Sequence, residues 1–417
     1  MNPAPVGAAP SPRMNPAPVG AAPSPRMNPV GGAGSFQVWR CPLWVPAQPG
    51  GIKRLLHLAS FALSSLPVML RQIVWRPDVV WVVEPALFCA PTALVVARLS
   101  GAKAWLHVQD FEVDAAFDLG LLRGKLLRRL VMGAERWLMR RFDVVSTISQ
   151  RMHQRLLAKG VAPGKAVLAV NWVDMAQFAL PSPEGVAAYR RELGLADDAV
   201  VALYSGNMGA KQGLEVLAEV ARLCQDYLRG EGAAPTNTGD APTNTADAPT
   251  ITADPVGAAP PPRMNSGLVF VFCGNGAGRA NLVQRCHGLT NVRFIDLQPA
   301  DRLPDLLTMA DIHLLPQRAD AADLVMPSKL TGMLASARPV VATAKPATEL
   351  ANVVQGCGMV VPPEDPAAFA EALKLLAADP VRCERLGAAG FLYAQAHLDK
   401  ESVLTKFEAD LQALVGC

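Results

Sequence analysis

Residues 200–223 read VVALYSGNMGAKQGLEVLAEVARL, and this stretch decides the fold class. The apolar run Val200–Tyr204 predicts a buried strand, and the helical spacing of apolar residues in LEVLAEVARL predicts a helix. Between them lies SGNMGAKQG, a turn with three glycines. A strand, a glycine-rich turn and a helix in this order are typical of a parallel sheet covered by helices, so we predict an α/β fold.

The same alternation of strand and helix runs through the rest of the chain. Further strands are predicted at Val79–Val83, Ala104–Val108, Val144–Thr147, Ala166–Val170, Leu268–Cys273, Val292–Ile295, Ile312–Leu315, Val340–Thr343 and Met359–Val361. The pattern predicts two Rossmann-like domains divided near Pro181–Leu195. We place an N-terminal domain at 37–190, a C-terminal domain at 195–230 and 266–380, and closing helices at 381–417.

Two tracts interrupt this alternation. The unit MNPAPVGAAPSPR fills 1–13 and recurs at 14–26, and three heptads of the type APTNTGD fill 234–254. Such Pro-rich repeats contain few large apolar residues, so they cannot bury enough surface to offset the entropy of the chain. We therefore expect disorder over 1–36 and a low-complexity insert over 231–265.

The composition excludes several classes of protein. A chain of 417 residues with 51% hydrophobic and 18% charged residues is not globally disordered. Its eight cysteines form no CxxC or metal-type cluster, so we expect a protein of the reducing cytosol that has neither a zinc site nor a disulfide framework.

Residues 1–191 carry 22 Lys and Arg against 10 Asp and Glu, whereas residues 192–417 carry 17 against 26. The basic half is expected to face an anionic surface, and we favour a membrane over nucleic acid.

One predicted helix has the composition of a membrane-surface segment. Over Leu121–Arg141, Leu122, Leu126, Leu130, Trp137 and Leu138 fall on one side, and Lys125, Arg128, Arg129 and Arg136 fall on the other with only Glu135 to offset them. We expect the basic side to bind anionic lipid, with the solvated face of an ordinary helix as the alternative. No segment is predicted to cross a membrane, because Leu55–Leu70 is too short and Val79–Ala97 contains a glutamate and two prolines.

Ligands of doubly wound sheets bind beyond the C-terminal ends of the strands, so the residues after each strand are candidates for a site. After Val200–Tyr204 come Gly206, Asn207 and Lys211. The glycines of this turn let the backbone approach a phosphate, and the lysine adds positive charge. A plain tight turn is the alternative.

Two other loops of the C-terminal half carry candidate residues. Gly274 and Asn275 begin a glycine-rich loop that departs from the GxGxxG spacing of dinucleotide sites, which disfavours NAD. Ser328 is a good N-cap, whereas the first-turn cation Lys329 opposes the helix dipole unless an anion is nearby. This conflict favours an anion site at Ser328 and Lys329 over a structural cap.

In the N-terminal half, His107 ends a strand and is followed by Asp110 and Glu112. A histidine with two carboxylates at the C-terminal end of a strand is a candidate for catalysis, and a structural histidine is the alternative.

Six collinear motifs resemble those of a known family: VWRCPLWVP (38–46), LHVQDFEVDAAFDLG (106–120), NWVD (171–174), YSGNMGAKQGLE (204–215), NVRFIDLQPADRLPDLL (291–307) and DLVMPSKLTGMLASARPVVAT (323–343). From about Val38 to Gly416, apart from the insert, the chain resembles a GT-B glycosyltransferase of family 4, of the colanic-acid-biosynthesis type that transfers a fucosyl or N-acetylfucosaminyl group.

This resemblance implies transfer of a sugar, with retention of the anomeric configuration and without metal or cofactor, from a nucleotide-sugar donor to a lipid-linked glycan acceptor. It implies an enzyme at the cytoplasmic face of the membrane. Gly206, Asn207 and Lys211 would face the donor diphosphate, as would Ser328 and Lys329. His107 would lie near the donor sugar, with the acceptor bound by the N-terminal domain.

The sequence departs from the family pattern at two places. The usual pair of glutamates is replaced by Leu324 and Gly332, and the strand, glycine-rich loop and helix expected before VWRCPLWVP are missing. Two alternatives therefore stay open at this point. One is a truncated, non-catalytic paralogue that at most binds nucleotide, and the other is a GT-B nucleotide-sugar epimerase.

Overall fold

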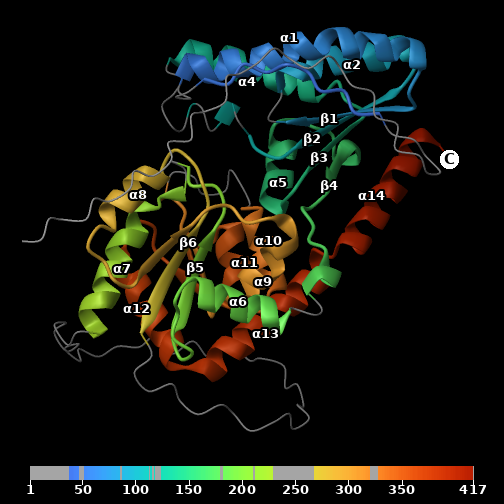
Figure 1. The fold of residues 1–417 in the computed structure, drawn as a ribbon. Helices are drawn as coiled ribbons and strands as arrows, with labels where there is room; N and C mark the ends of the chain where they lie inside the picture. Colours follow the sequence, from blue (N-terminus) through green and yellow to red (C-terminus); the bar gives the residue numbers. More distant parts are fainter. Residues whose placement is uncertain are drawn as a thin grey trace, which may run out of the picture.

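The computed structural model describes residues 37–46, 51–84, 87–111, 113–114, 117, 124–178, 182–209, 212–228, 267–319 and 327–416. Two parallel sheets with covering helices form two α/β domains in this part of the chain (Figure 1). All predicted strands are present, each with its ends within two residues of the expected positions. The predicted class, with two Rossmann-like domains, is confirmed. The repeat tracts 1–36 and 231–265 lie outside the described residues.

The N-terminal sheet has the order β1-β2-β3-β4, and all its strands are parallel. The strands are β1 (Val79–Glu84), β2 (Lys103–Val108), β3 (Val144–Thr147) and β4 (Ala166–Leu168). Each crossover advances in the same direction, so right-handed connections place the intervening helices on one face. These helices are α2 (Ala90–Ser100, preceded by η1, Leu87–Cys89), α4 (Lys125–Met139) and α5 (Gln150–Ala158), and η2 (Pro163–Lys165) leads into β4.

Helix α1 (Gly51–Trp75) extends beyond the apolar run Leu55–Leu70 that appeared too short to span a bilayer. Its segment Leu55–Trp75 has a mean hydropathy of 1.3, and by length and composition it could cross a membrane. However, α1 packs along α2, and Met69 and Ile73 contact the core of the domain. The helix therefore lies across the N-terminal domain, at the top of the molecule in Figure 1.

Helix α4 is oriented differently from what the charge pattern suggested. Glu135, expected to offset the basic side, is 1% exposed and pairs with the buried Lys159. The apolar side is only partly covered: Leu138 packs in the core, whereas Leu126 and Trp137 are 69% and 56% exposed. Over most of its length α4 therefore presents both apolar and basic side chains to solvent.

The C-terminal sheet has the order β10-β9-β8-β5-β6-β7, again with all strands parallel. Its strands are β5 (Val200–Ser205), β6 (Leu268–Cys273), β7 (Val292–Ile295), β8 (Ile312–Leu315), β9 (Val340–Thr343) and β10 (Gly358–Val361). Because helices cover both faces, the strands are near-continuous apolar runs rather than alternating ones.

The two faces of this sheet form separate cores. One core contains α7 (Glu215–Leu228), α8 (Arg279–Arg285) and α12 (Pro366–Ala378). The other contains α6 (Pro183–Glu192), α9 (Leu303–Met309, after η5, Ala300–Arg302), α10 (Lys329–Ala335), α11 (Glu349–Cys357) and α13 (Pro380–His397). Along β5, Tyr204 faces the first core and Leu203 faces the second, as the two-residue period of a strand requires.

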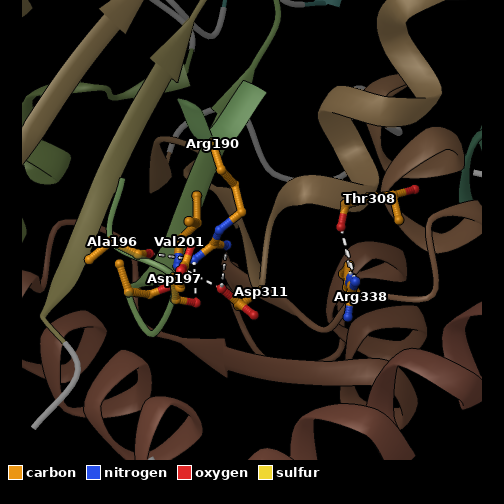
Figure 2. A network of polar contacts seen from close by, with 8 residues as sticks. Arg190, Ala196, Asp197, Val201, Thr308, Asp311 and Arg338 are labelled. Carbon is orange, nitrogen blue, oxygen red and sulfur yellow. Dashed lines mark hydrogen bonds and ion pairs between the residues drawn. The ribbon is translucent and has the colours of Figure 1, made fainter. Parts of the chain in front are cut away.

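Helix α6 falls within the range expected for the N-terminal domain, but it packs on the C-terminal sheet. Tyr189 lies in the second core, and Arg190 donates to the backbone carbonyls of Ala196 and Ala199 at 2.9 and 2.8 Å. Figure 2 shows Arg190 beside Asp311, whose carboxylate accepts from the Val201 amide at 2.8 Å. The same view shows Arg338 donating to the Thr308 carbonyl. These contacts join α6 to the ends of β5 and β8 that lie away from the candidate site.

The two domains are joined at several places. Val173, in the NWVD motif just before η3 (Met175–Phe178), exchanges backbone hydrogen bonds with Leu398 and Lys400. Helix α14 (Lys400–Val415) then reaches the N-terminal sheet, where the Phe407 ring packs between Trp81 and Trp105. The C-terminal helices thus extend from the core of one domain to the sheet of the other (Figure 1).

Candidate functional site

The candidate site lies where the strand order of the C-terminal sheet reverses. From β5 the chain proceeds outward to β6 and β7, and it then returns to β8 on the other side of β5. In open α/β sheets, ligands bind at the C-terminal ends of the strands at such a switch point. The loop that carries Gly206 follows β5, and the segment leading to Lys329 follows β8. The topology thus brings these two predicted regions to the same point.

Lys329 extends across the end of the sheet to the Gly206 loop. Its Nζ donates to the Tyr204 hydroxyl at 2.8 Å and lies 4.2 Å from the centre of the tyrosine ring. A Cβ added at Gly206 would lie 3.3 Å from this Nζ, so the glycine leaves room for the lysine. Burial lowers the pKa of Lys329 to about 8, because desolvation disfavours the charged form. The ammonium is therefore mostly charged at neutral pH and has little competing solvation.

The Gly274 loop packs against the Gly206 loop and is hydrogen-bonded to it. The Met208 amide donates to the Asn275 carbonyl at 2.9 Å, and the Gly278 amide donates to the Met208 carbonyl at 2.8 Å. Gly274 has φ +145°, and a Cβ there would lie 1.9 Å from the Gly206 carbonyl oxygen. These glycines are thus required by the close approach of the two loops.

The remaining predicted residues of this domain have mixed outcomes. Ser328 occupies the N-cap position of α10, but its side chain does not cap the helix and is exposed toward solvent. The structural cap, which was the alternative to an anion site, is therefore not formed by this side chain. Asn207 is exposed in the Gly206 loop. Lys211 lies outside the described residues.

His107 is enclosed in a network of neutral groups. The ring is 6% exposed, and its Nδ1 and Nε2 lie 2.8 Å from Ser146 Oγ and 2.7 Å from Gln109 Nε2. Burial lowers the pKa of His107 to about 4, so the imidazole is neutral at pH 7. Ser146 also accepts from Trp105 Nε1 at 2.8 Å. The partners of the ring are thus Ser146 and Gln109, where sequence reasoning had pointed to Asp110 and Glu112; Glu112 lies outside the described residues.

A pocket lies between the domains beside the candidate residues. Gln109 Nε2 donates to Asn171 Oδ1 at 3.2 Å, and Asn171 lines this pocket. Ser328 and Thr331 line the same pocket from the C-terminal domain. Asn171, which contacts the His107 network through Gln109, and the start of α10 therefore line one pocket. The sequence carried a signal for both additional polar residues, because Gln109 and Asn171 lie in the HVQDFE and NWVD motifs.

A second contact joins the two domains beside this pocket. The Glu349 carboxylate accepts from the backbone amides of Gln150 and Arg151, both at 2.8 Å, at the N-terminus of α5. A carboxylate at a helix N-terminus satisfies amides that lack intrahelical partners and complements the helix dipole. This contact joins α11 to α5, so it fixes the relative position of the two walls of the pocket.

Comparison with known proteins gives consistent matches. Residues 16–172 match the family model described as glycosyl transferase 4-like domain, and residues 257–379 match glycosyl transferases group 1. The chain is 39% identical over 391 residues to WcaI of Escherichia coli (strain K12), described as a colanic acid biosynthesis glycosyl transferase. That match covers 91% of this chain and 84% of the relative.

Solved structures share the fold. HepE of Anabaena, in complex with UDP and glucose, superposes with a TM-score of 0.61 at 14% identity, over 83% of this chain and 82% of HepE. The sucrose-phosphate synthase of Thermosynechococcus elongatus gives 0.65 at 15% identity, over 91% and 84% of the two chains. Together with the extent of the WcaI match, these findings show that the chain is a glycosyltransferase enzyme with the GT-B fold and belongs to glycosyltransferase family 4.

Proposed function

We propose that the chain transfers a sugar from a nucleotide-sugar donor to a lipid-linked glycan intermediate, with retention of the anomeric configuration, at the cytoplasmic face of a membrane. The observation that carries this proposal is the placement of the Lys329 ammonium against the Gly206 loop at the switch point of the C-terminal sheet. A structure of HepE contains UDP-glucose and another contains UDP, which supports a nucleotide-sugar donor for a chain of the same fold.

The chemistry explains why a fixed cation is useful here. When the bond between the sugar and the diphosphate breaks, the leaving nucleoside diphosphate gains negative charge. A preorganised ammonium and backbone amides at that place stabilise the charge, and they do so most strongly where water is excluded. Lys329 meets this requirement because Tyr204 and the Gly206 loop partly enclose it. We therefore propose that transfer needs no metal ion, and dialysis against EDTA is expected to leave turnover unchanged.

His107 is assigned to the donor sugar. A neutral imidazole cannot act as an imidazolium acid at pH 7, but it can accept or donate one hydrogen bond. Its Nε2 is held by Gln109, and a sugar hydroxyl that displaces this amide would bind the ring. His107→Ala is expected to lower turnover more than donor affinity. An equal loss in both would indicate a structural histidine.

Isothermal titration with UDP and GDP tests the donor site. Lys329→Ala is expected to weaken binding of the preferred nucleotide by about 1–3 kcal/mol, the range for a hydrogen bond to a charged group. Lys374→Ala is a matched control, because Lys374 pairs with Glu371 on the outer helix α12. Unchanged affinity in Lys329→Ala would refute the proposed site. Incubation with nucleotide sugars, followed by NMR of the product, distinguishes transfer from epimerisation and retention from inversion.

The lipid-linked acceptor is proposed from the outer surface of the N-terminal domain. Helix α1 exposes Leu63 and Val74, at 70% and 87%, and α4 exposes Leu126, Leu130 and Trp137. Figure 1 shows α1 and α4 at the end of this domain that is remote from the C-terminal domain. Exposed leucines with a tryptophan are typical of helices that lie in the membrane interface.

Basic side chains accompany this apolar surface. Arg129 and Arg136 are exposed on α4, and Arg71 is exposed on α1. Each basic residue near an anionic leaflet contributes about 1 kcal/mol, so a few are enough for reversible binding. Because α1 packs against α2 and places Met69 and Ile73 against the core of the domain, we propose that it lies on the membrane surface and does not span the bilayer.

Vesicle sedimentation tests the membrane proposal. Binding is expected to require anionic lipid, to weaken with salt, and to fall in Arg129→Glu/Arg136→Glu and in Leu126→Ser/Leu130→Ser. Arg385→Glu is the matched control, since Arg385 is an exposed arginine of α13 in the C-terminal domain. Equal binding to neutral vesicles, or no binding to anionic vesicles at low salt, would contradict the proposal.

A further inference from the structure

Tyr204 has an unusual place for a polar side chain. It is fully buried near the end of β5, a strand whose other core-facing residues are aliphatic. A buried hydroxyl destabilises a fold unless it is hydrogen-bonded. The Tyr204 hydroxyl is bonded twice: it donates to the Asn207 carbonyl at 2.7 Å, and it accepts from Lys329 Nζ at 2.8 Å.

These two bonds join loops that follow different strands. Asn207 lies in the loop after β5, and Lys329 begins α10 after β8. Tyr204 belongs to the core on one face of the sheet, whereas α10 packs on the other face. The Lys329 side chain must therefore pass over the ends of the strands to reach the hydroxyl. This path fixes a long side chain that would otherwise occupy several rotamers.

We propose that Tyr204 is a positioning residue for donor binding: its hydroxyl and ring hold the Lys329 ammonium against the Gly206 loop, in the place where the diphosphate of the donor binds. The inference rests on the proposed function, because it takes Lys329 as part of the donor site. Tyr204 itself need not touch the donor.

The electrostatics fit this role. Burial raises the pKa of Tyr204, so the hydroxyl stays protonated. It donates a hydrogen bond to the Asn207 carbonyl, and an oxygen lone pair accepts from Lys329. Burial also lowers the pKa of Lys329 to about 8, and among the described residues Tyr204 is the titratable group seen in contact with it. A hydrogen bond to the charged form favours that form. Loss of the hydroxyl should therefore lower the pKa of Lys329 further.

The test uses Tyr204→Phe in the full-length chain, with the nucleotide, UDP or GDP, that the wild type binds more tightly. The variant keeps the ring over Lys329 and removes both hydrogen bonds. At pH 7.5 its affinity is expected to fall roughly fivefold to twentyfold, part of the effect of a hydrogen bond to a charged group. Between pH 7.5 and 9.5 the loss of affinity with rising pH is expected to begin at a lower pH than in the wild type.

Two further variants separate positioning from folding. Tyr189→Phe is the matched control, because Tyr189 is also a buried tyrosine of this domain, bonded through its hydroxyl to Gln298, and it should leave affinity and pH profile unchanged. In Tyr204→Phe/Lys329→Met, affinity should equal that of Lys329→Met alone, because Tyr204 acts through the lysine. If Tyr204→Phe is unstable, restoration of the melting temperature by Lys329→Met would support the pairing.

The outcomes distinguish failure of the proposed function from failure of the role of Tyr204 alone. A wild type that binds neither nucleotide, or a Lys329→Met variant with unchanged affinity, would refute the proposed function. Weakened binding in Lys329→Met with unchanged affinity and pH profile in Tyr204→Phe would overturn only the role of Tyr204. Additive losses in the double variant, or instability that Lys329→Met does not relieve, would make the hydroxyl structural and would also overturn it.

Discussion

Substitution of Gly274 by alanine is a sharp test of how the site is built. The residue has φ +145°, a conformation that L side chains rarely adopt, and this strain costs about 1–3 kcal/mol. An added Cβ would lie 1.9 Å from the Gly206 carbonyl oxygen, which is far inside the contact distance. Overpacking of this kind costs about 1–3 kcal/mol more. We expect Gly274→Ala to lower the free energy of unfolding by about 2–6 kcal/mol in total.

Gly288→Ala provides the matched control. Gly288 belongs to the same domain and has φ +83°, but nothing lies within 4 Å of its added Cβ. Its cost should be limited to backbone strain of about 1–2 kcal/mol. Urea denaturation followed by circular dichroism measures the difference between the variants. Titration with UDP or GDP should show weaker binding in Gly274→Ala alone, because the methyl group displaces the Gly206 loop. Equal stability of the two variants, with unchanged nucleotide affinity, would refute the packing argument.

Two other predictions concern His107 and Glu349. The pKa of His107 is about 4 in the folded chain and near 6.5 when unfolded, so its contribution to stability is present above pH 6.5 and is lost as pH falls toward 4. His107→Gln should therefore reduce the loss of stability between pH 6.5 and 4 by about 2–3 kcal/mol in acid denaturation. If stability falls equally with pH in the variant and the wild type, the ring is not buried in the neutral form. Glu349→Ala removes the acceptor of two amides at the start of α5 and should cost about 0.5–2 kcal/mol. It should also widen the pocket between the domains in small-angle X-ray scattering, whereas Glu371→Ala should not, and identical scattering would show that other contacts hold the domains together.

The candidate site was predicted in part from its local chemistry. Gly206 was identified because a glycine turn after a strand lets the backbone approach a phosphate, and Lys329 because a first-turn cation conflicts with the helix dipole. Their meeting could be expected only in outline, from the rule that ligands bind at strand ends. Tyr204 was counted as part of a strand, although a hydroxyl in the apolar run VVALY, two residues before Gly206, was a usable signal. The partners of His107 were not foreseen, because Ser146 comes from the neighbouring strand, 39 residues away.

The sequence by itself determined the order of strands and helices, the α/β class and the division into two domains. These follow from local periodicity, which records on which sides each element is buried. The tertiary structure decided which residues meet. Lys329 bonds to Tyr204 across 125 residues, because the strand order places β8 next to β5. Helix α4 shows the same limit: Glu135 turns inward only because Lys159 of the neighbouring segment neutralises it in the interior. A helical projection gives the spacing of charges around one helix, but the side that faces the protein depends on partners that local sequence does not contain.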